Sequence, residues 1–403
     1  MNPLWISHFT VTSSIGCGLG ATLAALRERR SGLVPCLFDT VDLDVFIGKV
    51  DGLDTVHLPE ALTDFNCRNN RLAFLALNQD GFADAVRAAT GKYGARRVGL
   101  FLGTSTSGIF ETELAYRRRD PVSGALPPDF DYRSTHNPFA VAELARRYFG
   151  LSGPAAVASS ACSSSAKVFA SARRMLAAGL IDAALVGGVD SLCLTTLYGF
   201  NSLGLVSPRA CRPFDLARDG ISIGEAAAFA LLERAPNELP ADAVLLLGVG
   251  ESSDAYHMSS PHPEGLGARI AMHDALKMAG LEPSAIDYIN LHGTATQNND
   301  AAEAKAVCAV FGADGVSQTP CSSTKGATGH TLGAAGSVEA VICALALQNG
   351  LLPAGLNTRE IDPSLGVNYL LHNGERPVNT ALSNSFGFGG TNCSLILARA
   401  DRP

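Results

Sequence analysis

Short apolar runs typical of β-strands alternate with segments of helical periodicity along almost the whole chain. The alternation stops once, at the polar, proline-rich stretch 234–240, and then resumes. Strands that alternate with helices predict a layered α/β architecture. We therefore expect an α/β fold of two halves, residues 1–236 and residues 241–403, joined by a linker.

The predicted elements follow from this periodicity. Predicted strands lie at 4–14, 97–102, 155–161, 181–189, 243–249 and 286–291, and a glycine-rich turn separates two strands within 382–398. Predicted helices lie at 21–30, 163–178, 266–279, 300–311 and 333–348. The run 181–189 is apolar apart from Asp182, which indicates a strand covered on both faces. The stretch 121–138 is rich in proline and aspartate and indicates a surface excursion.

Composition and charge exclude several functions. Of the 403 residues, 47% are hydrophobic and 17% are charged, so we expect a large buried core. The net charge of −7 provides no global positive field for nucleic acid. No apolar run approaches the roughly 18 residues of a membrane span. Residues 1–8 carry no basic segment followed by an apolar run, so we do not expect them to be a secretory leader. We expect a cytoplasmic protein that binds neither nucleic acid nor membrane.

Cys162 stands apart from the other nine cysteines, which are scattered without a CxxC pair or zinc-type spacing. That scatter predicts reduced, mostly buried thiols and no metal site. Cys162 lies between an apolar strand and a small-residue helix, within 158–165 (ASSACSSS). The helix N-terminus there offers free N–H groups and partial positive charge, which favour a thiolate. Because a lone cysteine before a helix is usually inert, this candidate nucleophile needs support from other residues.

Two histidines supply that support. His292 follows a predicted strand in 290–296 (NLHGTAT), where a side chain points into the crevice at the sheet edge. His330 ends the polar loop 323–330 (STKGATGH), just before a predicted helix. Either histidine could instead be a hydrogen-bonded core residue. The loop 383–392 (SNSFGFGGTN) can present backbone N–H groups, but it lacks the GxGxxG spacing of a nucleotide loop.

Together these four segments resemble one family over almost the entire chain: the elongating beta-ketoacyl-acyl-carrier-protein synthases of the thiolase superfamily, close to synthases I and II. The matching motifs are the alanine–cysteine elbow, HGTxT, STKxxxGH and GFGGTN, with RPFD at 212–215, RDG at 218–220 and DAYHM at 254–258. The resemblance implies a thiolase-like, layered α-β-α-β-α fold from two similar halves. The first half would hold the nucleophilic cysteine, and the second both histidines.

The resemblance also implies a decarboxylative Claisen condensation of malonyl-carrier protein with an acyl group, which gives a beta-ketoacyl-carrier protein. Cys162 would hold the acyl chain as a thioester. The backbone N–H groups of Cys162 and Phe388 would form the oxyanion hole. His292 and His330 would donate hydrogen bonds to the malonyl thioester carbonyl and stabilise the enolate that forms as carbon dioxide leaves.

Further residues are assigned by the same resemblance. Lys325 would organise the catalytic site rather than act as a base, and it would pair with Glu339 or Glu303. Thr294 and Thr296 would hydrogen-bond the pantetheine arm of the substrate.

The acyl pocket is assigned in the same way. Phe388 would gate the pocket, with 254–261 as a second moving loop, and Phe386 would contact substrate. Thr106 is small where synthase II-like enzymes carry a bulky aliphatic residue at the acyl-pocket dimer interface, so it would leave room and offer a hydroxyl to the chain.

The implied partners are an acyl carrier protein and malonyl and acyl thioesters. Phosphopantetheine belongs to the carrier, so the chain would need no cofactor of its own. A homodimer and a heterodimer with a chain-length factor both remain open. Because carrier proteins are acidic and this chain is negative, docking would need a local basic patch. The candidate arginines are Arg68, Arg71, Arg117, Arg118, Arg119, Arg209 and Arg212.

Other interpretations are weaker or open. A thiolase needs a second catalytic cysteine, but Cys393 lies beyond the GFGG loop and fits a strand interior. Initiating synthases carry a Cys–His–Asn set, whereas this chain has a second histidine, His330. An inactive chain-length factor or scaffold, the alternative function, lacks the nucleophile that this chain keeps. Three features depart from housekeeping synthases: the small Thr106, the short segment 205–212 and the alanine-rich segment 225–228. Two interpretations therefore stay open, a specialised aryl polyene or polyketide synthase and ordinary fatty acid elongation.

Overall fold

Strand β1 (Leu4–Ser13) lies at the centre of the sheet, because β9 (Ala226–Arg234) pairs with one of its edges and β10 (Val244–Ser253) with the other. The computed structural model describes residues 3–313 and 315–401. In these residues thirteen strands form one continuous sheet, with the main order β12-β13-β11-β17-β18-β10-β1-β9-β7-β5-β6. The β1–β10 pairing covers only residues 4–6 of β1, so the two halves of the sheet are joined at one end.

The two half sheets have the same topology. The first runs β6 (Ala155–Ala158), β5 (Val98–Gly103), β7 (Ala183–Asp190), β9, β1, with two parallel pairings followed by two antiparallel ones. The second runs β13 (Val316–Ser322), β11 (Tyr288–Asn290), β17 (Thr380–Gly387), β18 (Thr391–Arg399), β10, with the same directions. This repeat confirms the expected fold of two similar halves.

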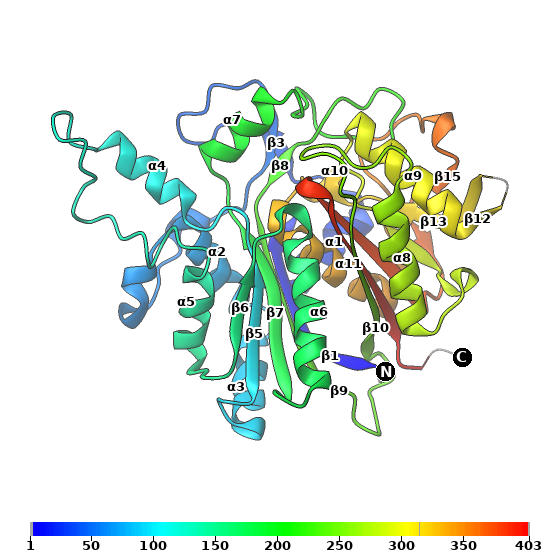
Figure 1. The fold of residues 1–403 in the computed structure, drawn as a ribbon, viewed down its shortest axis with the longest axis horizontal. Helices are drawn as coiled ribbons and strands as arrows, with labels where there is room; N and C mark the ends of the chain where they lie inside the picture. The colour runs from blue at the N-terminus through cyan, green and yellow to red at the C-terminus, as the bar shows by residue number, and fades with distance from the viewer. Residues whose placement is uncertain (1–2, 314, 402–403) are drawn as a thin grey trace.

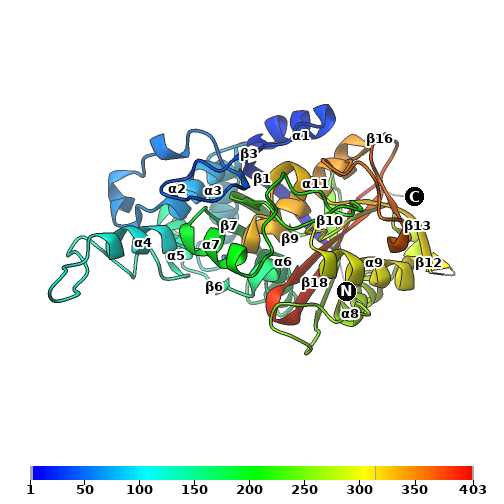
Figure 2. The ribbon, with the colours of Figure 1, turned by 90° about the horizontal axis from the view of Figure 1, so that it is seen from above.

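Helices form the other three layers (Figures 1 and 2). On the first half sheet pack α2 (Arg68–Leu77), α3 (Phe82–Tyr93) and α5 (Ala140–Phe149), and on the second α8 (Leu266–Ala279) and α9 (Gln297–Phe311). Between the half sheets lie α6 (Ser164–Ala177) and α11 (Ala335–Asn349), which contact strands of both. The order of layers is therefore α-β-α-β-α.

Smaller elements complete the fold. The helices are α1 (Leu19–Glu28) on β1, the mutually packed α4 (Ile109–Arg117) and α7 (Leu194–Ser202), and α10 (Lys325–Thr328). The short strands are β2 (Gly16–Cys17), β3 (Leu33–Pro35), β4 (Phe46–Gly48), β8 (Ile223–Gly224), β12 (Gly312–Ala313), β14 (Leu351–Leu352), β15 (Val367–Tyr369) and β16 (Gly374–Glu375). In Figure 1 α4 and the loop after it project from the body at the left.

Helices α6 and α11 touch each other at the centre. A Cβ atom on Gly336 would lie 2.6 Å from the backbone nitrogen of Ala166 and 2.7 Å from its Cβ, so only glycine permits this approach. The segment Leu332–Asn349 has the length and mean hydropathy (1.3) of a membrane span, but 89% of it is buried inside the protein. It is the core helix around which both half sheets pack.

Most predicted elements are confirmed, and the differences have local causes. Every residue of β7 is buried, as expected of a strand covered on both faces. The predicted strand 155–161 ends at Ala158, because Ala161 has a φ of 50° and turns the chain. The sequence did not predict β9, whose run Ala226–Ala228 has low strand propensity. Its pairing with β1 and β7 on both edges outweighs that propensity.

Arg68 corrects one expectation. It is 2% exposed, so it cannot contact a carrier protein as a free surface cation. Its Nε and Nη2 donate to both oxygens of Glu225, at 2.8 and 2.6 Å, and its Nη1 donates to Asp54. Glu225 is fully buried and also accepts the backbone N–H groups of Val50 and Leu192. Its position at the start of α2, facing inward, makes Arg68 a structural residue.

Replacing Arg68 should therefore destabilise the fold. Arg68→Ala leaves the Glu225 carboxylate buried without its cation, which typically costs about 3–5 kcal/mol of the free energy of unfolding. Equilibrium urea denaturation measures the loss. Arg97→Ala is the control, because Arg97 and Asp182 form a solvent-exposed pair and their separation should change the unfolding midpoint little. Equal midpoint shifts in the two variants would contradict the structural role of Arg68.

Candidate active site

Cys162 lies on a tight turn between β6 and α6. The turn is the short 3-10 helix η3 (Ala161–Ser163), and Ala161 adopts a left-handed conformation that a residue with a side chain rarely takes. The hydroxyl of Ser164 donates to the carbonyl of Ala161 at 2.5 Å and accepts the backbone N–H of Ser160. These bonds hold the turn, so the Cys162 side chain is fixed at the N-terminus of α6.

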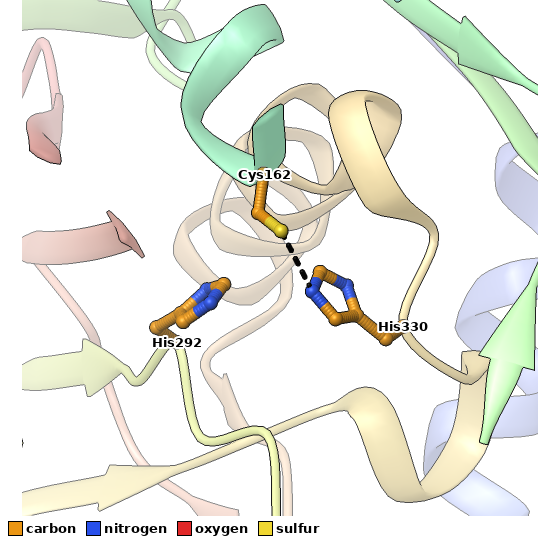
Figure 3. A group of neighbouring side chains, drawn as sticks. All are labelled: Cys162, His292 and His330. Atoms are coloured by element: carbon orange, nitrogen blue, oxygen red, sulfur yellow. Dashed lines mark hydrogen bonds between the residues drawn. The ribbon is translucent and has the colours of Figure 1, made fainter. Parts of the chain in front are cut away.

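His330 meets Cys162 from the second half of the chain (Figure 3). Its Nε2 lies 3.1 Å from Cys162 Sγ. The backbone N–H of Leu332 points at its Nδ1, at 3.3 Å. An N–H group can only donate, so Nδ1 accepts and the ring proton of the neutral imidazole is on Nε2. His330 therefore presents an N–H donor toward the sulfur.

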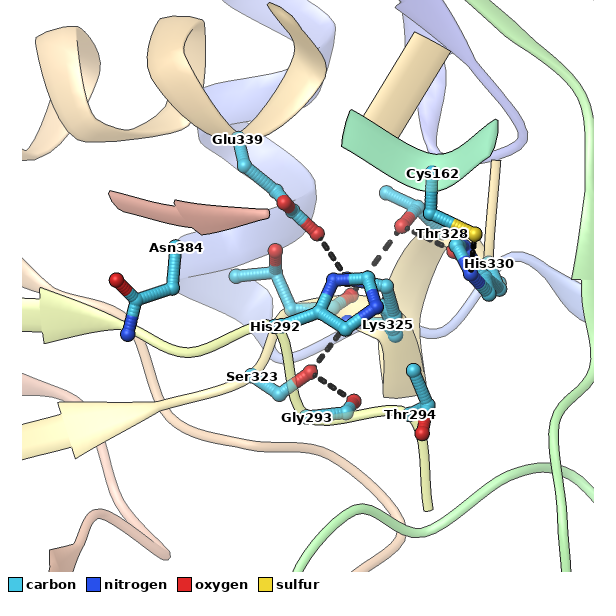
Figure 4. A network of polar contacts seen from close by, with 12 residues as sticks. Cys162, His292, Gly293, Thr294, Ser323, Lys325, Thr328, His330, Glu339 and Asn384 are labelled. Carbon is cyan, nitrogen blue, oxygen red and sulfur yellow. Dashed lines mark hydrogen bonds and ion pairs between the residues drawn. The ribbon is translucent and has the colours of Figure 1, made fainter. Parts of the chain in front are cut away.

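His292 lies on the other side of the sulfur and has the same tautomer (Figures 3 and 4). Its Nδ1 is 3.4 Å from Nζ of Lys325, an ammonium group that can only donate. Its Nε2 is thus the protonated nitrogen. The two imidazole rings are 5.3 Å apart between centroids and nearly perpendicular, at 83°.

Lys325 and Glu339 form a buried ion pair behind His292. Nζ of Lys325 donates to Oε1 of Glu339, and the two side chains are 1% and 3% exposed. Burial raises the pKa of Glu339 to about 7, while the charge of Lys325 and its hydrogen bond oppose this rise. Of the two glutamates that the sequence offered as partners of Lys325, the structure brings Glu339 to it.

Glu303 instead holds the backbone at His292. Its Oε1 accepts the N–H of His292 at 2.8 Å, and its Oε2 accepts the N–H of Gly293 at 2.7 Å. The Asn384 side chain also donates to Oε1. Burial raises the pKa of Glu303 to about 7, against the lowering effect of these donors. Glu303 therefore fixes the turn that carries His292.

Burial controls the charge of the three central side chains. It lowers the pKa of both imidazoles well below the usual value, and the positive charge of Lys325 lowers them further, so both rings are neutral at neutral pH. Burial also raises the pKa of Cys162 to about 12, although Lys325 and the backbone N–H of Phe388 favour the thiolate. The resting site holds a neutral thiol between two neutral N–H donors.

A pocket of about 350 Å³ opens from these three side chains to the surface. Thr294, Thr296, Phe386 and Phe388, which the family resemblance assigned to substrate binding and gating, all line this pocket. The hydroxyls of the two threonines are 2.8 Å apart. Further lining residues include Phe200, Leu203, Asp219, Asp254, Ser259, Pro261, Gln297 and Asn298. The Phe388 ring packs on Phe200, with centroids 5.5 Å apart.

Thr106 does not line this pocket in the described chain. It is fully buried, and its hydroxyl donates to Oδ1 of Asp190 at 2.8 Å. The hydroxyl oxygen of Thr106 also accepts the N–H of Ser191. The expectation that Thr106 offers a free hydroxyl to the acyl chain is therefore wrong. Its polarity is explained by its carboxylate partner.

Asp190 and Phe200 lie at or beside the site but were not predicted from the sequence. Asp190 follows the apolar run 181–189 directly, so its place at the end of a buried strand was the available signal. Phe200 lies in α7, far in sequence from the motifs, and no pattern marked it.

Comparison with known proteins agrees with this geometry. Residues 71–237 match the family model described as Beta-ketoacyl synthase, N-terminal domain, and residues 243–359 match its C-terminal domain. The chain is 32% identical to 3-oxoacyl-[acyl-carrier-protein] synthase 2 of Vibrio cholerae over 98% of both chains. It is 41% identical to the mitochondrial synthase of Arabidopsis thaliana over 62% of this chain and 57% of that protein.

Solved structures give the same result. A ketosynthase, ApeO, in complex with its chain length factor ApeC from Xenorhabdus doucetiae has a TM-score of 0.88 and 38% identity over 99% of this chain and 98% of that one. The ishigamide ketosynthase/chain length factor has a TM-score of 0.87 and 28% identity over 99% of both chains.

The fold and the Cys–His–His site define a condensing enzyme of the thiolase-like class. The chain belongs to the beta-ketoacyl synthase family. Its activity is that of an acyltransferase that elongates an acyl chain by carbon–carbon condensation.

The raised pKa of Cys162 predicts how its reactivity changes with pH. The thiolate is the reactive form, so alkylation by iodoacetamide should accelerate about tenfold per pH unit between about pH 7 and about pH 10, without a plateau. Peptide mass spectrometry should follow the label at Cys162 separately from that at the exposed Cys17, and Cys193→Ala, which removes a fully buried cysteine, should leave the rate at Cys162 unchanged. A rate that levels off below about pH 8 would show that the helix N-terminus outweighs burial.

Proposed function

We propose that Cys162 carries the growing acyl chain during the condensation. Its sulfur attacks the carbonyl of a carrier-bound acyl thioester, the new Cys162 thioester forms, and the thiol proton ends on the released pantetheine thiol. The backbone N–H groups of Cys162 and Phe388 bind the oxyanion. Support comes from the Phe388 N–H, which already faces the sulfur.

We propose that His292 and His330 act in the second half-reaction. Their Nε2–H groups donate to the carbonyl oxygen of a malonyl thioester. The bond to the carboxylate breaks, carbon dioxide leaves, and the electron pair forms an enolate that both donors stabilise. The enolate carbon attacks the acyl-Cys162 carbonyl, and the Cys162 thiolate leaves and takes up a proton. The observation that carries this proposal is the donor on each Nδ1, from Leu332 and from Lys325.

The two half-reactions should separate in histidine variants. His292→Ala and His330→Ala should still be acylated at Cys162 but lose malonyl decarboxylation by about 10²–10³-fold, the usual cost of one oriented donor. Mass spectrometry of the intact protein reports acylation, and release of labelled carbon dioxide reports decarboxylation. Near-normal decarboxylation in both variants would refute the assignment.

The pocket accounts for the carrier arm. Thr294 and Thr296 would hydrogen-bond the amides of the pantetheine arm. That arm belongs to the carrier protein as its phosphopantetheine group, so the chain would need no cofactor of its own. Of the remaining candidate arginines, Arg209 is 60% exposed and pairs with the pocket-lining Asp219 at 2.6 Å. Arg209 therefore lies one hydrogen bond from the pocket wall and is the best-placed contact for the acidic carrier. Arg212 pairs with the same carboxylate but is largely buried.

We propose that the chain is the catalytic subunit of a dimer, with a chain-length factor as its partner. The resemblance to ApeO, which is bound to a chain length factor, supports this partner. Strand β6 is at one edge of the sheet in the described chain, and Ala156 on it is exposed. An unpaired apolar edge is a template for pairing with a second chain. Homodimeric fatty acid elongation is the second candidate, supported by the Vibrio cholerae relative. We expect either complex in the cytoplasm.

The edge of β6 offers a test of the dimer. The carbonyls of Pro154 and Ala158 accept the N–H groups of Leu100 in β5 and of Thr104 just after it. Successive residues of a strand direct their backbone groups to opposite edges, so the N–H of Val157 points away from β5. Val157→Pro removes that outward N–H and should convert a dimer to a monomer in size-exclusion chromatography with light scattering, while β5 keeps its bonds.

Co-expression decides between the two candidates. The chain would be produced with its own carrier protein, with and without a candidate chain-length factor, and the acyl group on Cys162 would be identified by mass spectrometry. Unsaturated chains that form only with the chain-length factor support the proposal. Saturated chains made by the chain alone support fatty acid elongation. An unacylated Cys162 under every condition would contradict both.

A further inference from the structure

Asp190 lies where the two halves of the active site meet, although it is not among the residues that line the active-site pocket in the described part of the chain. It is the last residue of β7 and is fully buried. Around it pass three segments: the turn 104–106 after β5, the η3 turn with Cys162, and the 3-10 helix η5 (Leu332–Ala334), which follows His330. The η5 turn packs against both β7 and η3.

The carboxylate of Asp190 collects five donors. Its Oδ1 accepts the N–H groups of Ser105 and Thr106, at 2.8 and 2.7 Å, and the hydroxyls of Thr104 and Thr106, both at 2.8 Å. Its Oδ2 accepts the N–H of Gly333 at 2.5 Å. Burial raises the pKa of Asp190, but these donors favour the charged form. A buried carboxylate with so many donors is a fixed anchor for the backbone around it.

The bond to Gly333 restrains the turn that carries the tautomer of His330. Leu332 has a φ of 51°, a left-handed conformation that is unfavourable for a residue with a side chain. The peptide that follows it ends in the Gly333 N–H held by Asp190. The N–H of the same Leu332 donates to Nδ1 of His330. If the Gly333 bond is lost, Leu332 can relax to a negative φ and its N–H turns away from the imidazole.

The glycine at 333 is required by the same contact. A Cβ atom there would lie 2.8 Å from Oδ2 of Asp190 and 2.7 Å from Oγ of Ser105. A side chain would therefore push the turn away from the carboxylate. The close approach of η5 to Asp190 therefore depends on both partners, the carboxylate at 190 and the glycine at 333.

We propose that Asp190 is a positioning residue for decarboxylation: by holding the Leu332–Gly333 peptide, its carboxylate keeps the Leu332 N–H on Nδ1 of His330 and the proton on Nε2. The inference rests on the function proposed for His330. Asp190 reaches the nucleophile less directly, because Ser105 donates to the carbonyl of Ala161 only at 3.4 Å. Its negative charge also raises the pKa of Cys162. The two half-reactions should therefore respond to Asp190 in opposite directions.

The test measures both half-reactions in Asp190→Asn. Malonyl decarboxylation should fall by about 10²-fold, as for a lost oriented donor, whereas alkylation of Cys162 should be unchanged or faster. Thr104→Val is the matched control, because it removes one bond to Oδ1 and leaves the Gly333 bond intact. It should lower the melting temperature without changing the ratio of decarboxylation to alkylation.

Gly333→Ala approaches the same contact from the other side and leaves the Asp190 charge in place. It should reproduce the loss of decarboxylation, and it decides the question if Asp190→Asn does not fold. Wild-type decarboxylation in a folded variant of either kind would overturn the proposal. So would an equal fall of decarboxylation and alkylation, which is the signature of a merely structural residue.

Nitrogen NMR spectra of the His330 imidazole, assigned by comparison with His330→Ala, report which ring nitrogen carries the proton. In the wild type Nε2 should be protonated, and in Asp190→Asn the Nδ1-protonated form should appear. An unchanged tautomer would refute the positioning role. Normal decarboxylation in His330→Ala would instead refute the function proposed for His330, and the NMR result would still judge Asp190.

Discussion

The close packing of α6 against α11 is the constraint on which the rest of the molecule depends. Gly336 lets the two helices touch at Ala166, so the half sheets on either side share one central layer. Cys162 precedes α6, and His330 precedes η5 and α11. Because the two helices start side by side, a residue of the first half and a residue of the second, 168 positions apart, come within 3.1 Å. The catalytic pair is a consequence of the duplicated topology.

Burial at this central position determines the electrostatics. A charge survives there only with compensation, and each one has it: Lys325 with Glu339, Glu303 with two backbone N–H groups, and Asp190 with five donors. The three central side chains, Cys162, His292 and His330, are neutral. The buried charges therefore act through the positions of the imidazoles and of the backbone, and none of them lines the floor of the pocket with Cys162.

The sequence predicted what is local and left open what depends on packing. The strand–helix alternation and the motifs around Cys162, His292 and His330 identified the layers and the family, because periodicity and short motifs are written in consecutive residues. The partner of Lys325 stayed open, since Glu303 and Glu339 are both spaced plausibly. Arg68 was expected at the surface because the sequence shows its charge but not its partner, and Thr106 was assigned to the acyl pocket by the family resemblance. Each has a buried carboxylate partner more than 80 positions away, which the sequence does not reveal.

The N–H donors that the two histidines present explain why the site suits an enolate. The Nδ1 atoms of both histidines are occupied by Lys325 and Leu332, so each imidazole ring has one N–H group, on Nε2, to present to a substrate. A neutral thioester carbonyl accepts them weakly, and the enolate oxygen, which carries the developing charge, accepts them strongly. Because the rings are already oriented and the low polarity of the pocket strengthens each bond, the gain is largest in the transition state. A charged imidazolium would bind the malonyl carboxylate instead and oppose its loss. The depressed pKa of both histidines is thus a requirement of decarboxylation as much as a result of burial.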